Sequence, residues 1–139
     1  MFICDISVFN KYGKQRLDEM LLPMQTDWRE LVVMLVAEQV PGISQTRLIP
    51  FLQTDKANVT KLLQAMEIKD LIIREADNED HRNKLCYLTD RSQKLIPQLN
   101  EVLKRWEDAC FQGIGKDELA QFQSISERIS QNLLNKWHT

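Results

Sequence analysis

The sequence predicts a mostly α-helical protein with one small β-hairpin. Apolar residues recur at steps of three and four over most of the chain, which indicates amphipathic helices. Two short apolar runs, at residues 71–73 and 85–88, are separated by a polar loop and indicate a hairpin. The 139 residues contain only four glycines and four prolines, too few for a Greek-key or loop-rich all-β fold. A chain of this length is expected to form a single domain, residues 1–139, with its own core.

Two helices are expected before the first tight turn. Residues 2–22 have a loosely helical apolar spacing that ends at Pro23. Residues 27–39 carry apolar side chains on one helical face, with Thr26 as the expected N-cap. The pair Pro41-Gly42 stops this second helix.

Two shorter helices follow the turn. Ser44 is the expected N-cap of the third, and Thr54 or Asp55 caps the fourth, at about residues 55–69. The apolar face of the fourth helix consists of Val59, Leu62, Leu63 and Met66. Its opposite face consists of Ala57, Thr60, Lys61 and Gln64.

Two longer helices are expected after the hairpin. Thr89 is a suitable N-cap for a helix from 90 to about 112, which either is kinked at Pro97 or effectively starts there. After two glycines, a last helix spans about residues 116–136, and its apolar stripe continues to Trp137.

Two short helices joined by a tight turn and followed by a hairpin form a winged helix-turn-helix, here at about residues 26–89. The flanking helices, about 1–22 and 90–137, have apolar faces without an obvious partner in so small a module. We therefore expect them to be N- and C-terminal dimerisation helices that bury those faces against a second copy of the chain.

Composition constrains the function only weakly. The chain is 43% hydrophobic and has a formal net charge of −2, as in many soluble proteins. No apolar run is long enough to cross a membrane, and residues 1–10 do not resemble a signal peptide, so we expect a cytoplasmic protein without membrane contact. Cys4, Cys86 and Cys110 are far apart and odd in number, and we expect three reduced thiols packed as small hydrophobes.

Several short motifs occur in order between Ile43 and Asp90. They are D-K-A-N-V-T-K at 55–61, Leu71-Ile72, D-H-R at 80–82 and L-T at 88–89. In this order and spacing they resemble the MarR family of bacterial winged helix-turn-helix transcription regulators. That family's recognition helix often starts D-x-S-T-V-T-R, and its wing carries D-R-R. The flanking helices also match the family's dimerisation helices in order and length, so the resemblance covers nearly the whole chain.

Four positions depart from the family pattern. Asp70 stands where the family usually has Gly, and Asp can adopt the left-handed conformation there at some cost. Ser92 also replaces a common Gly. His81 replaces the middle Arg of the wing motif, and Lys61 replaces an Arg of the recognition helix.

The resemblance implies a homodimeric, sequence-specific regulator that binds a pseudo-palindromic operator in double-stranded DNA. It further implies that the regulator is a repressor, which a small aromatic effector releases from the operator. The third helix offers backbone N–H groups to phosphate, the fourth enters the major groove, and Arg82 enters the minor groove. The expected DNA-binding residues are Ser44, Gln45, Thr46, Lys56, Asn58, Thr60, Lys61, Gln64, Arg82 and Lys84. Asp80 is expected to support the wing, by pairing with Arg82 or by accepting backbone N–H bonds.

The effector of such a regulator is expected in a crevice between the dimerisation helices and the DNA-binding lobe. The candidates to line it are Phe9, Met24, Trp28 and Met34, each of which fits a core position equally well. Some family members sense oxidants through a cysteine in the first helix. Nothing next to Cys4 is basic enough to lower its pKa, so we expect a buried or incidental thiol there.

Two alternatives to a DNA-binding regulator are a protein-interaction module and an enzyme. Residues 42–90 contain seven basic and eight acidic side chains, and this lack of positive charge favours an alternative, a winged-helix module for protein interaction or dimerisation without operator binding. Several of the acids, Glu75, Asp77, Glu79 and Asp80, crowd the polar segment that follows the first strand. An enzyme is not expected, because the two histidines, His81 and His138, lack catalytic neighbours in sequence and no glycine-rich phosphate loop is present. We expect no cofactor and no metal.

Overall fold

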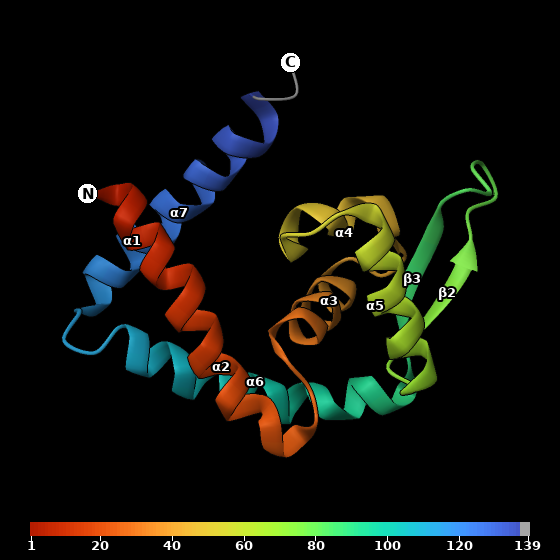
Figure 1. Ribbon diagram of the computed structural model, residues 1–139. Helices are drawn as coiled ribbons and strands as arrows, with labels where there is room; N and C mark the ends of the chain where they lie inside the picture. Colours follow the sequence, from red (N-terminus) through yellow and green to blue (C-terminus); the bar gives the residue numbers. More distant parts are fainter. Residues whose placement is uncertain (137–139) are drawn as a thin grey trace. The chain divides into compact units, whose positions relative to one another are not determined.

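The computed structural model describes residues 1–136 and confirms the predicted fold class, mostly helical with a small antiparallel sheet (Figure 1). Its contacts divide the chain into two compact units, Met1–Trp106 and a second unit that starts at Glu107. The winged helix-turn-helix lies entirely within the first unit. Trp137, the end of the predicted apolar stripe and of the segment 90–137, and His138 lie outside the described residues.

The N-terminal helix is continuous but not uniform. It consists of α1 (Phe2–Val8), a π-helical turn (Phe9–Gly13), α2 (Lys14–Leu21) and a closing 3₁₀ turn (Leu22–Met24). The indole N–H of Trp106, near the end of α6 (Asp90–Cys110), donates to the Gly13 carbonyl at 2.9 Å. The π turn therefore lies where the first helix meets α6.

The next helix, α3 (Trp28–Gln39), begins one residue later than predicted. Asp27, not Thr26, is its N-cap, because the Asp27 carboxylate accepts from the backbone N–H groups of Arg29 and Glu30 at 3.0 Å each. The Thr26 hydroxyl instead donates to the carboxylate of Glu30 at 2.8 Å. Both side chains can cap a helix, and only the backbone conformation at Asp27 decides between them.

The sheet has three strands rather than the predicted two. A short strand, β1 (Ile43–Ser44), pairs antiparallel with β3 (Lys84–Leu88), which also pairs with β2 (Ile72–Ala76). Two residues are too few to show the alternation that identifies a strand in sequence. Strand β2 also extends further than expected, because Arg74 and Glu75, which begin the polar segment, pair with Cys86 and Leu85.

Between these strands lie the two short helices, α4 (Gln45–Leu52) and α5 (Lys56–Ile68). The Ser44 cap is confirmed, since its hydroxyl accepts from the Arg47 N–H at 3.3 Å. Of the two candidates for the next cap, Thr54 and Asp55, the structure selects Asp55, whose carboxylate accepts from the Asn58 N–H at 2.8 Å. The apolar faces of α4 and α5 form the core of the module together with α3 and the sheet. Its fully buried side chains include Leu31, Met34, Leu48, Leu52, Val59, Leu63, Met66 and Cys86.

The turn after α5 adopts the conformation expected of Asp70. This residue has φ +58, and the Leu71 N–H donates back to the Met66 carbonyl at 2.9 Å. That hydrogen bond closes the helix end in the usual left-handed manner. The Thr89 hydroxyl also donates to the Asp70 carbonyl at 2.7 Å, which ties the end of α5 to the start of α6.

Helix α6 begins at Asp90, well before Pro97, so Pro97 lies within it. Its start is a reciprocal cap: the Thr89 hydroxyl accepts from the Ser92 N–H at 3.1 Å, and the Ser92 hydroxyl accepts from the Thr89 N–H at 3.0 Å. Ser92 is fully buried. The serine that departs from the family pattern therefore completes a capping box.

The second unit contains the end of α6 and helix α7 (Lys116–Lys136). The turn between them includes Gly113 at φ +81, a backbone conformation that favours glycine. The rings of Phe111 and Phe122 meet edge to face, with 5.6 Å between centroids. Several apolar side chains of α7 are exposed, namely Phe122, Ile125, Leu133 and Leu134.

The cysteines do not all behave as small buried hydrophobes. Cys86 is buried in the core, and its burial raises the pKa of the thiol to about 11. Cys4 and Cys110 are exposed, so the prediction of three packed thiols is wrong for these two. Among residues 1–136, no helix combines the length and apolar character needed to span a membrane.

We predict that Ser92→Ala lowers the free energy of unfolding by about 1 kcal/mol, the usual value of a helix cap, because the Thr89 N–H loses the nearer of its two acceptors and keeps only the Leu71 carbonyl at 3.4 Å. Urea denaturation measures this change. The control is Ser124→Ala on the exposed surface of α7, which should change stability by a few tenths of a kcal/mol at most. Equal effects of the two substitutions would contradict the role given to Ser92.

Candidate nucleic-acid interface

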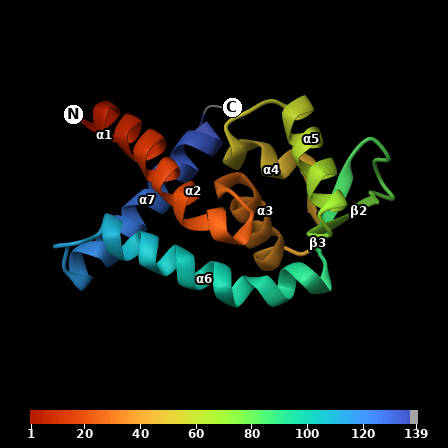
Figure 2. The same ribbon diagram turned by 60° about the horizontal axis from the view of Figure 1, so that its bottom comes forward.

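Helix α5 presents its polar face to solvent beside the β2–β3 hairpin, and α4 packs against α5 (Figures 1 and 2). Lys56, Asn58, Lys61 and Gln64 are exposed on α5, whereas Thr60 is half-buried. The Asn58 side-chain amide donates to the Thr54 hydroxyl at 3.0 Å, so the residue before the N-cap of α5 holds this side chain. The apolar face of α5 fixes the helix axis, and its polar face remains available to a partner.

A polar network, here called the Arg74 network, connects α4, α5 and β2. It consists of Gln45, Thr60, Glu67 and Arg74. The Arg74 guanidinium donates to the Glu67 carboxylate at 2.8 Å through Nε, and its Nη1 donates to the Gln45 side-chain oxygen at 3.1 Å. The Gln45 amide in turn donates to the Thr60 hydroxyl at 2.7 Å. One guanidinium therefore joins a strand of the wing to both helices of the helix-turn-helix.

The Arg74 network changes what is expected of two predicted site residues. The Gln45 side chain is 7% exposed and, like the Thr60 hydroxyl, is hydrogen-bonded inside the protein. Gln45 still contributes its backbone N–H at the start of α4. Arg74 and Glu67 were not among the predicted site residues. The alternation of side chains along a strand could have indicated Arg74, because it places this residue on the same face of β2 as the buried Ile72.

The tip of the wing is held by its acids. The Asp80 carboxylate accepts from the Arg82 N–H at 3.1 Å, and the Asp80 carbonyl accepts from the Asn83 N–H at 3.0 Å. The Asp77 carboxylate likewise accepts from the Glu79 N–H at 3.0 Å. Of the two roles considered for Asp80, the backbone bond is present, while an Asp80–Arg82 ion pair is absent from residues 1–136. The Arg82 side chain is exposed.

A second contact ties the wing to the helix-turn-helix. The Thr46 hydroxyl, in the first turn of α4, donates to the Asn83 side-chain oxygen at 3.3 Å. The same Asn83 oxygen accepts from the Lys84 N–H at 3.1 Å. The N-terminus of α4 and the base of the wing are thus held at a fixed spacing, and Asn83 is a positioning residue that the sequence did not suggest.

Ion pairing does not make residues 42–90 basic, because it engages two of their seven basic side chains and one of their eight acidic ones. Lys69 pairs with Glu30 at 2.7 Å and Arg74 with Glu67 at 2.7 Å, so these charges are directed into the protein. The exposed bases of the module are Arg47, Lys56, Lys61, Arg82 and Lys84. Arg47 is an exposed base that the predicted DNA-binding residues did not include. Its position in the sequence, a basic residue in the first turn after the Ser44 cap, could have indicated it.

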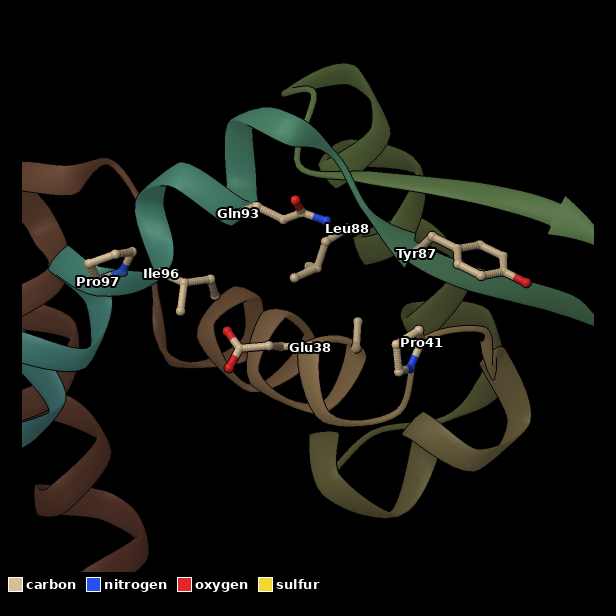
Figure 3. Close-up of a pocket in the computed structure, with 8 residues that line it drawn as sticks. Glu38, Pro41, Tyr87, Leu88, Gln93, Ile96 and Pro97 are labelled. Atoms are coloured by element: carbon tan, nitrogen blue, oxygen red, sulfur yellow. The ribbon is translucent and has the colours of Figure 1, made fainter.

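The four predicted effector residues do not come together in one cavity. Met24 and Met34 line a hollow of about 30 Å³, which is the volume of one water molecule. Phe9 is exposed, and the ring of Trp28 is covered by the Lys14 ammonium at 3.6 Å from its centroid. A larger hollow, of about 310 Å³, lies elsewhere, among α3, β3 and α6 (Figure 3).

These elements define a winged helix-turn-helix protein. The family model that matches the chain is that of the MarR family, over residues 27–84. The crystal structure of MarR shares 25% identity, covers 96% of this chain and 97% of its own, and superimposes with a TM-score of 0.79. Residues 27–84 are therefore similar to the MarR family of winged-helix transcription regulators, and the chain shares the fold of the MarR structure.

Two further similar structures contain ligands. A MarR-family regulator from Listeria monocytogenes complexed with 26mer DNA is 18% identical, with a TM-score of 0.84 and coverage of 97% of this chain and 90% of its own. CouR from Rhodococcus jostii RHA1 bound to p-coumaroyl-CoA is 21% identical, with a TM-score of 0.78 and coverage of 90% and 88%. At these identities, the two structures establish the shared fold.

We predict that Arg74→Met lowers the free energy of unfolding by about 1–3 kcal/mol, because Glu67 and Gln45 lose a partner in a partly buried place. Arg74→Met and Glu67→Leu should not be additive, since they remove the same ion pair. Chemical denaturation of both single variants and the double variant measures the coupling. Additive effects would show that the pair does not connect β2 to α5.

Proposed function

We propose that the protein is a sequence-specific regulator of transcription that binds double-stranded DNA. The observation that carries this proposal is the connected surface formed by the polar face of α5, the N-terminus of α4 and the wing. The Arg74 network and the Thr46–Asn83 bond hold these three parts at fixed positions. The DNA-bound regulator from Listeria monocytogenes, which has the same fold, supports the proposal.

Each part of the surface has its own role in this proposal. Asn58, Lys61 and Gln64 contact base edges in the major groove, where amide and ammonium groups distinguish bases. Lys56 and Lys84 contact phosphates, as do the backbone N–H groups at Ser44, Gln45 and Thr46. Thr60 touches DNA only at its exposed edge, since its hydroxyl bonds Gln45 and the Lys56 carbonyl. Arg82, at the wing tip, enters the minor groove.

We further propose that the regulator is a homodimer formed by its terminal helices, residues 1–22 and 90–137. Apolar side chains that a partner would cover are exposed on both segments, among them Phe2, Ile3 and Ile6 on α1 and Phe122, Ile125 and Leu133 on α7. Two recognition helices about one turn of DNA apart, roughly 10 bp, require a pseudo-palindromic operator.

The regulator acts as a cytoplasmic repressor released by a small-molecule effector, without catalysis or a cofactor of its own. The structure of CouR with p-coumaroyl-CoA supports a small-molecule ligand for this fold. An effector releases the dimer from DNA only if it binds more tightly to a conformation in which the spacing of the two recognition helices does not fit the operator.

Selection of bound DNA from a random pool tests the proposal. We expect enrichment of a pseudo-palindrome with half-sites roughly 10 bp apart. Asn58→Ala should then reduce operator affinity by about 1–3 kcal/mol and relax the sequence preference, because one amide contact is lost. Selection that enriches no sequence at low salt would refute operator binding and favour a protein-interaction module.

We predict that Asp80→Ala weakens operator binding about fivefold although it removes a negative charge. The reason is that the Arg82 N–H loses its acceptor, worth about 1 kcal/mol, and the wing tip loosens. The control is Glu79→Ala, which removes a charge from the same loop but keeps both Asx bonds, and it should bind DNA equally well or more tightly. Electrophoretic mobility shift measures both, and tighter binding by Asp80→Ala would show that Asp80 merely repels phosphate.

A further inference from the structure

The hollow of about 310 Å³ lies among the C-terminal end of α3, strand β3 and the first turns of α6. Its volume is at the lower end of the range of ligand pockets, roughly 300–1,000 Å³. The wall is mostly apolar, with Pro41, Leu88, Ile96 and Pro97 among its members. Figure 3 shows Leu88 from β3 and Ile96 from α6 facing the helix that carries Glu38. Its lining includes none of the predicted DNA contacts and none of the predicted effector residues, although it lies between α6 and the winged helix-turn-helix, in the kind of crevice where an effector is expected.

Glu38 is the charged residue of this wall. Its carboxylate extends from α3 toward the first turns of α6 (Figure 3). Within residues 1–136, Glu38 takes part in no ion pair. A negative charge without a partner, at the edge of an apolar hollow, favours a cationic ligand and disfavours an anionic one.

A second acceptor comes from the proline in α6. Pro97 has no N–H, so the carbonyl of Gln93, four residues earlier, lacks the donor it would normally have in a helix. Gln93 and Pro97 both line the hollow. The side-chain amide of Gln93, which extends from α6 beside Leu88, adds a further oxygen (Figure 3). Side chains with acceptor oxygens from two helices therefore line one apolar hollow.

We propose that this cavity binds a small organic ammonium ion with an apolar or aromatic body. The ammonium group donates to the Glu38 carboxylate and to the Gln93 oxygens, because three N–H donors match acceptors on two sides. The apolar body packs against Leu88, Ile96 and Pro41. This site is defined without reference to DNA, so it does not depend on the proposed function.

Three probes with one skeleton test the charge preference: 2-phenylethylammonium, 2-phenylethanol and phenylacetate. Isothermal titration calorimetry of the full chain near neutral pH measures their affinities. We expect the ammonium to bind about tenfold more tightly than the alcohol, since charge-assisted hydrogen bonds replace neutral ones, and phenylacetate to bind most weakly. An ammonium that fails to bind at millimolar concentration, or phenylacetate that binds as well, would overturn the proposal.

Two variants test the acceptors. Glu38→Gln keeps the shape of an exposed side chain and should lower the affinity for 2-phenylethylammonium about tenfold, to the level of the alcohol. Glu19→Gln, an exposed acid on α2, should leave it unchanged. Pro97→Ala supplies an N–H for the Gln93 carbonyl and should weaken binding about threefold while raising the melting temperature. Unchanged binding by Glu38→Gln, with a native circular dichroism spectrum, would refute the site.

Discussion

The candidate DNA-binding surface depends on one guanidinium group. Arg74 lies on strand β2, yet its side chain bonds Glu67 near the end of α5 and Gln45 at the start of α4. Because Gln45 also holds the Thr60 hydroxyl, the recognition helix is fixed at both ends relative to the wing. Apolar packing alone allows helices to slide, whereas a planar group with several directed donors sets their spacing. A fixed spacing is what a protein needs to place base contacts and wing contacts on the same DNA.

Two of the four acids of the wing segment, Asp77 and Asp80, have a local structural role. Asp77 and Asp80 accept backbone N–H bonds within the loop, and Asp55 accepts one at the start of α5. The charge of a carboxylate that accepts such bonds is partly offset by the N–H dipoles. The nearby bases, Arg82 and Lys84, remain exposed. Three acids of the module thus shape the backbone, while its unpaired bases face outward beside further exposed acids such as Glu75 and Glu79.

Local signals in the sequence were reliable where a single short interaction decides the structure. Ser44, Asp55 and Thr89 are N-caps as predicted, since a cap needs only a side chain and the next three residues. The left-handed Asp70 was also foreseen. Thr26 failed because its neighbour Asp27 is an equally good cap. Strand β1 was missed because two residues carry no period, and only pairing with β3 makes them a strand.

By itself the sequence determined the order and type of the longer elements, their apolar faces and the resemblance to the MarR family, because all of these follow from spacing along the chain. Tertiary structure alone decided which polar side chains form hydrogen bonds inside the protein. Arg74, almost thirty residues after Gln45 along the chain, bonds the Gln45 side chain, which in turn bonds the Thr60 hydroxyl. Tertiary structure also placed Glu38, Gln93 and Pro97 around one cavity. Contacts between residues distant in sequence depend on how elements pack, and periodicity within one element carries no information about its neighbours.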